Sequence, residues 1–154
     1  MTGDYRTIVV GTDGSLLAAP TVARAARIAV HDGAGLVVVC AYGELSRRQE
    51  ARNVATLGGD TRIGLVTGRG AADEAVAAAV EVAREQRATV TAALLVEGEP
   101  AAALLETARE RAADLIVVGA LRDTSIADRL LGTVAGEVVR RAACEVLVVR
   151  PGTG

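Results

Sequence analysis

The segment Thr-Ile-Val-Val-Gly-Thr-Asp-Gly-Ser, residues 7–15, decides the fold that we expect for this chain. Its first part, Thr7 to Thr12, is short, apolar and rich in β-branched residues, as is typical of a strand buried in a parallel sheet. Asp13-Gly14-Ser15 has the composition of a turn, and Pro20 suits the first turn of a helix. The chain therefore begins with a strand, a short loop and a helix.

The alternation of strand and helix continues along the chain. Short apolar runs predict strands at residues 36–41, 89–96, 114–119 and 145–150, and helical spacing of apolar residues predicts helices at residues 71–87, 100–112 and 134–143. Strands that alternate with helices form a parallel sheet that is covered on both faces. The sequence thus predicts a single α/β domain over residues 1–154, with a three-layer, Rossmann-like open sheet.

A polar segment of about residues 43–70 separates the second strand from the second helix. Its arginines are Arg47, Arg48, Arg52, Arg62 and Arg69. Loops of this length are uncommon inside compact domains. Two interpretations stay open, a solvent-exposed excursion that contains a short helix, or a covering loop whose arginines reach an anionic ligand.

The composition narrows the classes of function. The chain has 154 residues and a net charge of −2, and this mildly acidic balance argues against nucleic acid as a partner. No apolar run approaches the roughly 20 residues of a membrane helix, and no secretory signal is visible, so we expect a cytoplasmic protein. The chain has no lysine, which excludes a P-loop lysine. Cys40 and Cys144 are expected to be buried, reduced thiols.

The stretch from Val118 to Val134 contains a candidate phosphate site. An apolar run stops at Gly119, a polar loop follows, and Gly132-Thr133 opens a helical pattern. Glycine lets a backbone approach a ligand closely, and the first N–H groups of a helix favour anions. The alternative is a plain connection in which Thr133 is the N-cap of the helix.

This loop meets the loop after the first strand only if the first and fourth strands are neighbours. Ligands of open α/β sheets bind beyond the carboxyl ends of the strands, at the point where the strand order reverses. Strand order does not follow from the order of elements along the chain.

Asp13 has two interpretations, as a residue of this ligand site or as a turn former whose side chain bonds to its own backbone.

The same residues resemble the universal stress protein family. Ile8 to Ser15 is similar to the start of such domains, and Asp114 to Gly119 followed by Gly132-Thr133-Val134 is similar to their later half. The nucleotide signature of the family is Gly, two residues, Gly, nine residues, Gly, then Ser or Thr. Gly119, Gly132 and Thr133 fall in register with it, and the resemblance extends from about Tyr5 to Pro151.

The resemblance implies a five-stranded parallel sheet in the order 3-2-1-4-5 and a homodimer through the C-terminal strand, residues 145–149. It also implies an adenine nucleotide, ATP or cyclic AMP, with or without Mg²⁺. Thr12 and Asp13 would hold the nucleotide, and Ala41 would meet adenine through its backbone. The ribose and phosphates would lie against the following residues: Val118, Gly119, Gly132, Thr133 and Val134.

Arg122 departs from the signature because it stands where the second glycine belongs. Its side chain either blocks the close approach that glycine allows, or turns inward and pairs with a phosphate. We therefore include Arg122 among the candidate nucleotide-binding residues and keep both outcomes open.

Three functions follow from these observations. The first is a dimeric cytoplasmic stress-response protein that binds an adenine nucleotide. The second is a nucleotide-free dimeric interaction or regulatory module whose pocket is closed by Arg122. The third, slow ATP hydrolysis, ranks last because the sequence offers no Walker lysine and no convincing general base, and we assign no catalytic or metal-binding residues.

Overall fold

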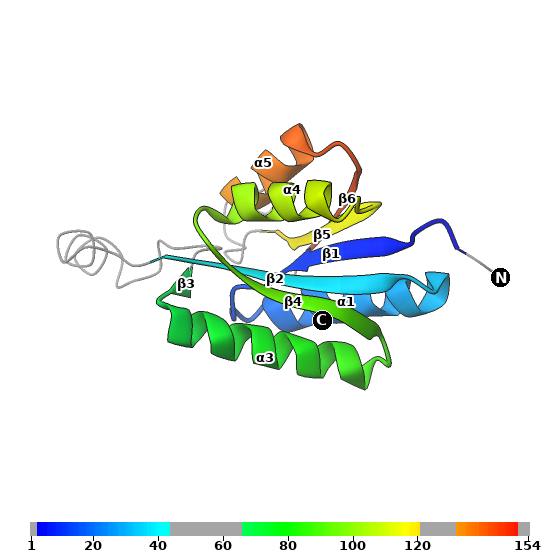
Figure 1. Ribbon diagram of the computed structural model, residues 1–154, viewed down its shortest axis with the longest axis horizontal. Helices are drawn as coiled ribbons and strands as arrows, with labels where there is room; N and C mark the ends of the chain where they lie inside the picture. The colour runs from blue at the N-terminus through cyan, green and yellow to red at the C-terminus, as the bar shows by residue number, and fades with distance from the viewer. Residues whose placement is uncertain (1–2, 44–65, 121–131, 151–154) are drawn as a thin grey trace.

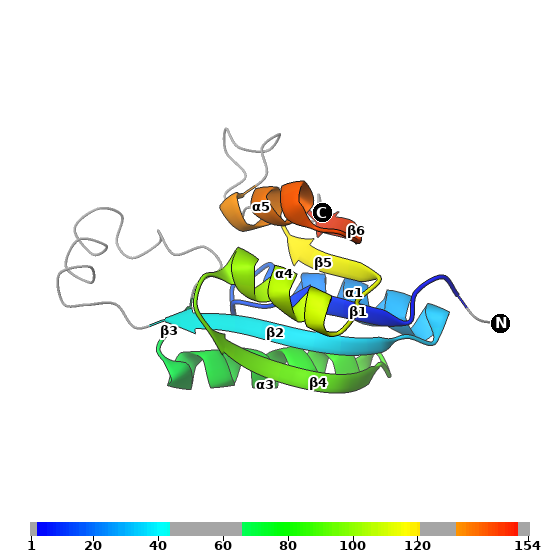
Figure 2. The same cartoon turned by 45° about the horizontal axis from the view of Figure 1, so that its top comes forward.

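A parallel β-sheet runs through the middle of the molecule, with α1 and α3 on one face and α4 and α5 on the other (Figures 1 and 2). The computed structural model describes residues 3–43, 66–120 and 132–150. The elements are β1 (Thr7–Gly11), α1 (Ala18–Asp32), β2 (Gly35–Gly43), β3 (Val66–Thr67), α3 (Arg69–Glu85), β4 (Thr89–Glu97), α4 (Pro100–Glu110), β5 (Leu115–Gly119), α5 (Thr133–Arg141) and β6 (Glu145–Val149).

The long strands lie in the order β4-β2-β1-β5-β6, and every pair is parallel. In the numbering of the predicted strands this is 3-2-1-4-5, so the predicted fold is confirmed. β1 pairs with β5 through Ile8–Leu115, Val9–Ile116 and Val10–Val117. The first and fourth predicted strands are therefore neighbours, and the loops that follow them start at the same edge of the sheet.

The strands are continuous apolar runs because both of their faces are buried. Ile8, Val10 and Val38 point toward α1 and α3, whereas Val9, Val37 and Ile116 point toward α4 and α5. All six side chains are buried. Side chains alternate along a strand, so one run of sequence contributes to two cores.

Two helices end earlier than the helical spacing predicts. The predicted ends were residues 87 and 112, but α3 ends at Glu85 and α4 at Glu110. Arg87 and Ala112 have positive φ values of 66° and 51°, which a right-handed helix does not accommodate. Glycine usually occupies such positions, and its absence here removed the signal that marks a helix end.

The polar segment between β2 and α3 ends in structure that the sequence did not predict. Val66–Thr67 forms the short strand β3, and α3 already begins at Arg69. Gly98 N donates to Tyr42 O (2.9 Å), and Gly68 N donates to Gly43 O (2.9 Å). Because successive carbonyls of a strand point to opposite sides, β3 lies on the β1 side of β2. Of the arginines in the covering-loop interpretation, Arg69 lies at the start of α3, and its Nη1 donates to Tyr42 Oη (3.5 Å). The other four belong to residues 44–65, which lie outside the described residues.

The two cysteines differ in burial. Cys40 is fully buried as predicted, whereas Cys144 is only partly buried, which corrects the prediction for that residue. Both are free thiols. Burial, with the charge of Asp13 as a second cause, raises the pKa of Cys40 to about 11, so this thiol stays protonated and unreactive near neutral pH.

No helix in the described part of the chain could span a membrane.

Asp114 joins the amino ends of β1 and β5. Its Oδ2 accepts hydrogen bonds from Arg6 N (2.8 Å) and Thr7 N (3.0 Å). The Asp114 N–H in turn donates to Thr7 O (2.9 Å). One residue thus fixes the start of the central strand against its neighbour.

We expect Asp114→Ala to lower the free energy of unfolding by about 1–3 kcal/mol, because two backbone donors lose a charged acceptor. Asp114→Asn keeps an acceptor oxygen and should lose less. Urea unfolding followed by circular dichroism measures both. Wild-type stability in Asp114→Ala would show that these bonds contribute nothing.

Candidate functional site

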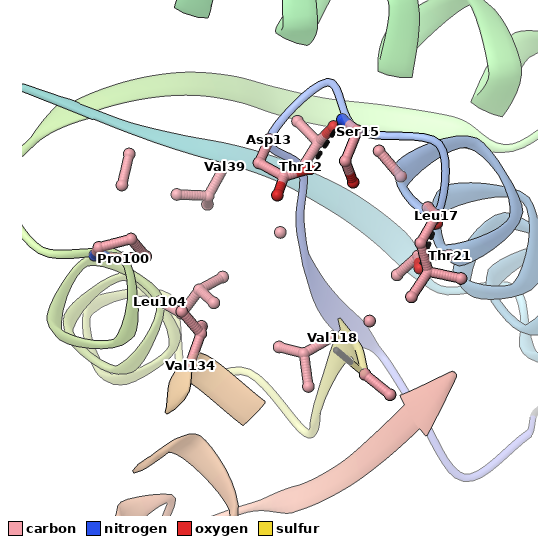
Figure 3. Close-up of a pocket in the computed structure, with 15 residues that line it drawn as sticks. Thr12, Asp13, Ser15, Leu17, Thr21, Val39, Pro100, Leu104, Val118 and Val134 are labelled. Atoms are coloured by element: carbon pink, nitrogen blue, oxygen red, sulfur yellow. Dashed lines mark hydrogen bonds between the residues drawn. The ribbon is translucent and has the colours of Figure 1, made fainter. Parts of the chain in front are cut away.

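A pocket lies beyond the carboxyl ends of β1, β2 and β5, at the point where the strand order reverses (Figure 3). It encloses about 590 Å³ of empty space, counted to its open mouth. The three strand ends form its floor, and the amino-terminal turns of α1, α4 and α5 contribute side chains around it. This is the position at which ligands bind in open α/β sheets.

The loop after β1 forms one wall of the pocket. Thr12 N donates to Val39 O (2.9 Å), which ties the loop to β2. Asp13 Oδ1 accepts a hydrogen bond from Ser15 N (2.8 Å), so the predicted turn role of Asp13 is confirmed. Gly14 has a φ of +75°, which glycine adopts without the steric cost of a side chain.

Aliphatic side chains form the opposite part of the pocket. Val118 comes from β5, Val134 from α5 and Leu104 from α4, and Figure 3 shows them across the space from Thr12 and Asp13. Val39 and Ala41 of β2 line the pocket as well. Pro100 lies in the first turn of α4, where the missing N–H of proline costs no helical hydrogen bond. Its ring is part of the pocket lining.

Gly119 allows α1 to pack closely against the end of β5. A Cβ at this position would lie 2.9 Å from Thr21 Oγ1 and 3.1 Å from Leu17 Cδ2. Thr21 Oγ1 is itself held, because it donates to Leu17 O (2.7 Å). The sequence attributed this glycine to ligand approach, and the structure adds a packing reason. Leu17 and Thr21 also line the pocket.

The start of α5 presents backbone donors beside the pocket that have no acceptor among the described residues. The first hydrogen bond within the helix runs from Gly136 N to Gly132 O (2.8 Å), so the N–H groups of Thr133, Val134 and Ala135 have no acceptor inside it. Gly132 is the N-cap, and no side chain caps this helix end. The prediction that Thr133 is the N-cap is therefore wrong, since the helix starts one residue earlier.

The structure brings most of the predicted site residues together. Thr12, Asp13, Ala41, Val118, Gly119 and Val134 all line the pocket. Gly132 and Thr133 do not line it, but they form the helix end that carries Val134. Arg122 lies outside the described residues.

Sequence reasoning missed the contributions of α1 and α4. Leu17, Thr21, Pro100 and Leu104 line the pocket, yet apolar residues at helical spacing give the same signal whether they face a core or a pocket. Only the carboxylate-bearing loop and the glycines carried a signal that pointed to a site. Pro100, at the start of a helix after a strand, could have identified the α4 turn.

The described lining of the pocket is weakly charged. It contains one carboxylate, Asp13, and no arginine or histidine. Among the described residues, no group of three or more His, Cys, Asp or Glu side chains could hold a metal ion. The described groups can thus bind an apolar body, accept a hydrogen bond at Asp13, and donate through the backbone at the start of α5.

Comparison with known proteins identifies relatives along the full length of this fold. The model of the universal stress protein family matches residues 4–150. The chain is 40% identical over 145 residues to universal stress protein Rv1636 of Mycobacterium tuberculosis, and the match covers 94% of this chain and 96% of that protein. A universal stress protein of Thermus aquaticus is 32% identical over 154 residues, covering 95% of this chain and 99% of the relative.

A solved structure with the same fold contains a ligand. It is a universal stress protein in complex with cAMP, with a TM-score of 0.70 and 36% sequence identity, and the match covers 96% of this chain and 98% of that one. Both the family model and the curated relatives cover nearly the whole chain, including the strands and loops that build the pocket. This chain therefore belongs to the universal stress protein family.

Proposed function

We propose that this protein binds an adenine nucleotide in the pocket at the carboxyl ends of β1, β2 and β5. The observation that carries this proposal is the coincidence of three features around one space. These are aliphatic walls, the Asp13 carboxylate and the uncapped start of α5. The relative that is 36% identical and was solved in complex with cAMP supports the same ligand class.

Each part of the pocket suits one part of a nucleotide. The flat, apolar faces of adenine fit between aliphatic side chains such as Val39, Ala41 and Leu104. Asp13 can accept hydrogen bonds from ribose hydroxyls. A phosphate is favoured at the first N–H groups of α5, where the helix dipole is positive.

The low charge of the described lining bears on the choice between ATP and cyclic AMP. Among the described residues, the lining offers no cationic side chain to a triphosphate. A cyclic monophosphate has a single negative charge, which the helix end can partly neutralise. ATP would require further positive charge, for which bound Mg²⁺ or Arg122 is a candidate.

The second candidate function is a nucleotide-free interaction or regulatory module. The observation that favours it is Arg122 at the position of a signature glycine.

For either candidate function, we propose a cytoplasmic stress-response protein. We also propose a homodimer that pairs through the open edge of β6, because a short apolar edge strand is protected when it is paired. Slow ATP hydrolysis remains the last candidate.

Purified protein titrated with cyclic AMP, AMP and ATP in a calorimeter should show binding, and Gly132→Val should abolish it. A side chain at Gly132 adds bulk at the N-cap, beside the donors proposed for the phosphate. Gly136→Val is the matched control on the same helix, because a Cβ there meets no described atom within 4 Å outside the local backbone of that helix. Absence of wild-type binding at millimolar ligand would refute the proposal.

Arg122→Gly separates the two roles of that arginine. If the guanidinium pairs with a phosphate, the variant should bind cyclic AMP more weakly, roughly 10-fold for the loss of one charged hydrogen bond. If the side chain fills the pocket, the same variant should bind more tightly. Unchanged affinity would eliminate both roles.

Dimerisation through β6 can be tested by removing one donor from its open edge. Ala120 N donates to Val149 O (2.8 Å), so the backbone N–H and C=O groups of Leu147 and Val149 point toward β5. Those of Val148 therefore point toward the open edge of β6. Val148→Pro should therefore yield a monomer in sedimentation experiments and keep the β5–β6 pairing. A wild-type protein that sediments as a monomer at tens of micromolar would contradict the dimer.

A further inference from the structure

The edge strand β4 lacks most of the features that keep sheet edges from pairing. It lies at the opposite edge of the sheet from β6, and within the described structure it pairs only with β2. From Thr89 to Val96 it has no charged residue and no proline, which are the usual protection of an exposed edge. The register skips Thr91, but this irregularity affects only the start of the strand. Residues 92–97 are therefore a regular and mainly apolar open edge.

Three residues of this segment direct their backbone groups away from the sheet. Gly98 N donates to Tyr42 O (2.9 Å), so Gly98 and every second residue before it face β2. Ala93, Leu95 and Glu97 consequently direct their N–H and C=O groups outward. In the described part of the chain these groups have no partner strand, and they can pair with a further strand.

Helix α3 runs beside β4 along the same border of the molecule (Figures 1 and 2). Val80 of α3 packs against the cluster that includes Leu95, and it is only partly buried. Val80 thus marks the flank of α3 that lies on the β4 side. Asp73, Ala77 and Arg84 lie on the same flank at helical spacing, and all three are exposed.

This flank of α3 is complementary to itself. When two copies are related by a two-fold axis, the two helices run antiparallel, so Asp73 faces the partner's Arg84 and the small Ala77 faces the partner's Val80. Both pairs share one midpoint along the helix, and a single axis therefore satisfies them together. Neither Asp73 nor Arg84 forms an ion pair with another described residue. The charge pattern thus favours a second copy of the chain as the partner.

We propose that a second copy of this chain docks on the β4–α3 surface, which consists of residues 92–97 and the α3 flank. The two β4 strands pair antiparallel and extend the sheet, and the two α3 helices pack against each other. A two-fold axis at Leu94 pairs Ala93 with the partner's Leu95, and the Leu94 side chains of both copies lie side by side. This surface is separate from the pocket and from β6, so the inference does not depend on nucleotide binding.

The contact is small, because it consists of one strand pair and one helix pair. We therefore expect weak association, with a Kd of roughly 0.1–1 mM, which leaves this contact mostly dissociated at tens of micromolar. Sedimentation equilibrium from about 10 µM to about 1 mM should show a reversible doubling of mass in this range. Association through β6 would double the mass at lower concentration.

Reversing charges on α3 tests the two-fold arrangement. Arg84→Glu should raise this Kd roughly 10-fold, because two unlike charge pairs become like pairs, and Asp73→Arg should do the same. The double variant restores unlike pairs and should regain most of the wild-type affinity. Glu85→Arg is the matched control, because it changes an exposed charge on another side of the same helix, and it should leave the Kd unchanged.

The pairing of the strands is tested separately. Ala93→Pro removes an outward N–H, which an edge strand tolerates, and should abolish the doubling of mass while circular dichroism shows a folded protein. Val148→Pro changes the β6 edge and should leave the weak step unchanged. If Ala93→Pro folds poorly, the charge variants still decide the question.

Three results would overturn the inference. A wild-type protein without this second association step up to about 1 mM would show that the contact does not form. A double variant no better than Arg84→Glu alone would exclude the two-fold pairing of α3. Loss of the weak step in Val148→Pro would show that the partner of β4 is the β6 edge of another copy.

Discussion

The pairing of β1 with β2 on one side and β5 on the other is the constraint on which the site depends. All of these strands are parallel, so their carboxyl ends lie at one edge of the sheet. The chain leaves β1 toward β2 in one direction and returns to β5 on the other side. The pocket lies beyond these strand ends, between the amino-terminal turns of α1, α4 and α5.

Close packing around this edge leaves little freedom in its walls. Gly119 permits α1 to contact the end of β5 through Leu17 and Thr21. The bond between Thr12 N and Val39 O holds the loop after β1 against β2. These contacts fix the backbone before any ligand binds, so that binding does not have to order the walls.

The electrostatics of the pocket are simple in its described part. One carboxylate and one uncapped helix end face a mainly aliphatic space. That arrangement suits a ligand with an apolar ring, hydroxyl groups and a small negative charge. Membership of the universal stress protein family agrees with this chemistry, and the arginine at position 122 is the residue on which the two candidate functions differ.

Much of the fold and part of the site could be predicted from the sequence. Apolar runs and helical spacing located the described helices and the five long strands to within two residues but missed β3, because burial on both faces imposes an apolar pattern on each long strand. Asp13 and the glycines identified the two loops, since few residue types adopt such turns. The resemblance to the family supplied the strand order, which local patterns do not contain.

Only the tertiary structure decided which helices complete the pocket. Leu17, Thr21, Pro100 and Leu104 come from turns far apart in the sequence, and nothing in their local pattern separates a pocket wall from a core. The packing role of Gly119, the pairing of β3 with the end of β2 and the partial burial of Cys144 depend on contacts between distant segments. A local sequence determines which conformation a segment prefers, whereas the partners of its side chains are determined by the elements that the chain folds against it.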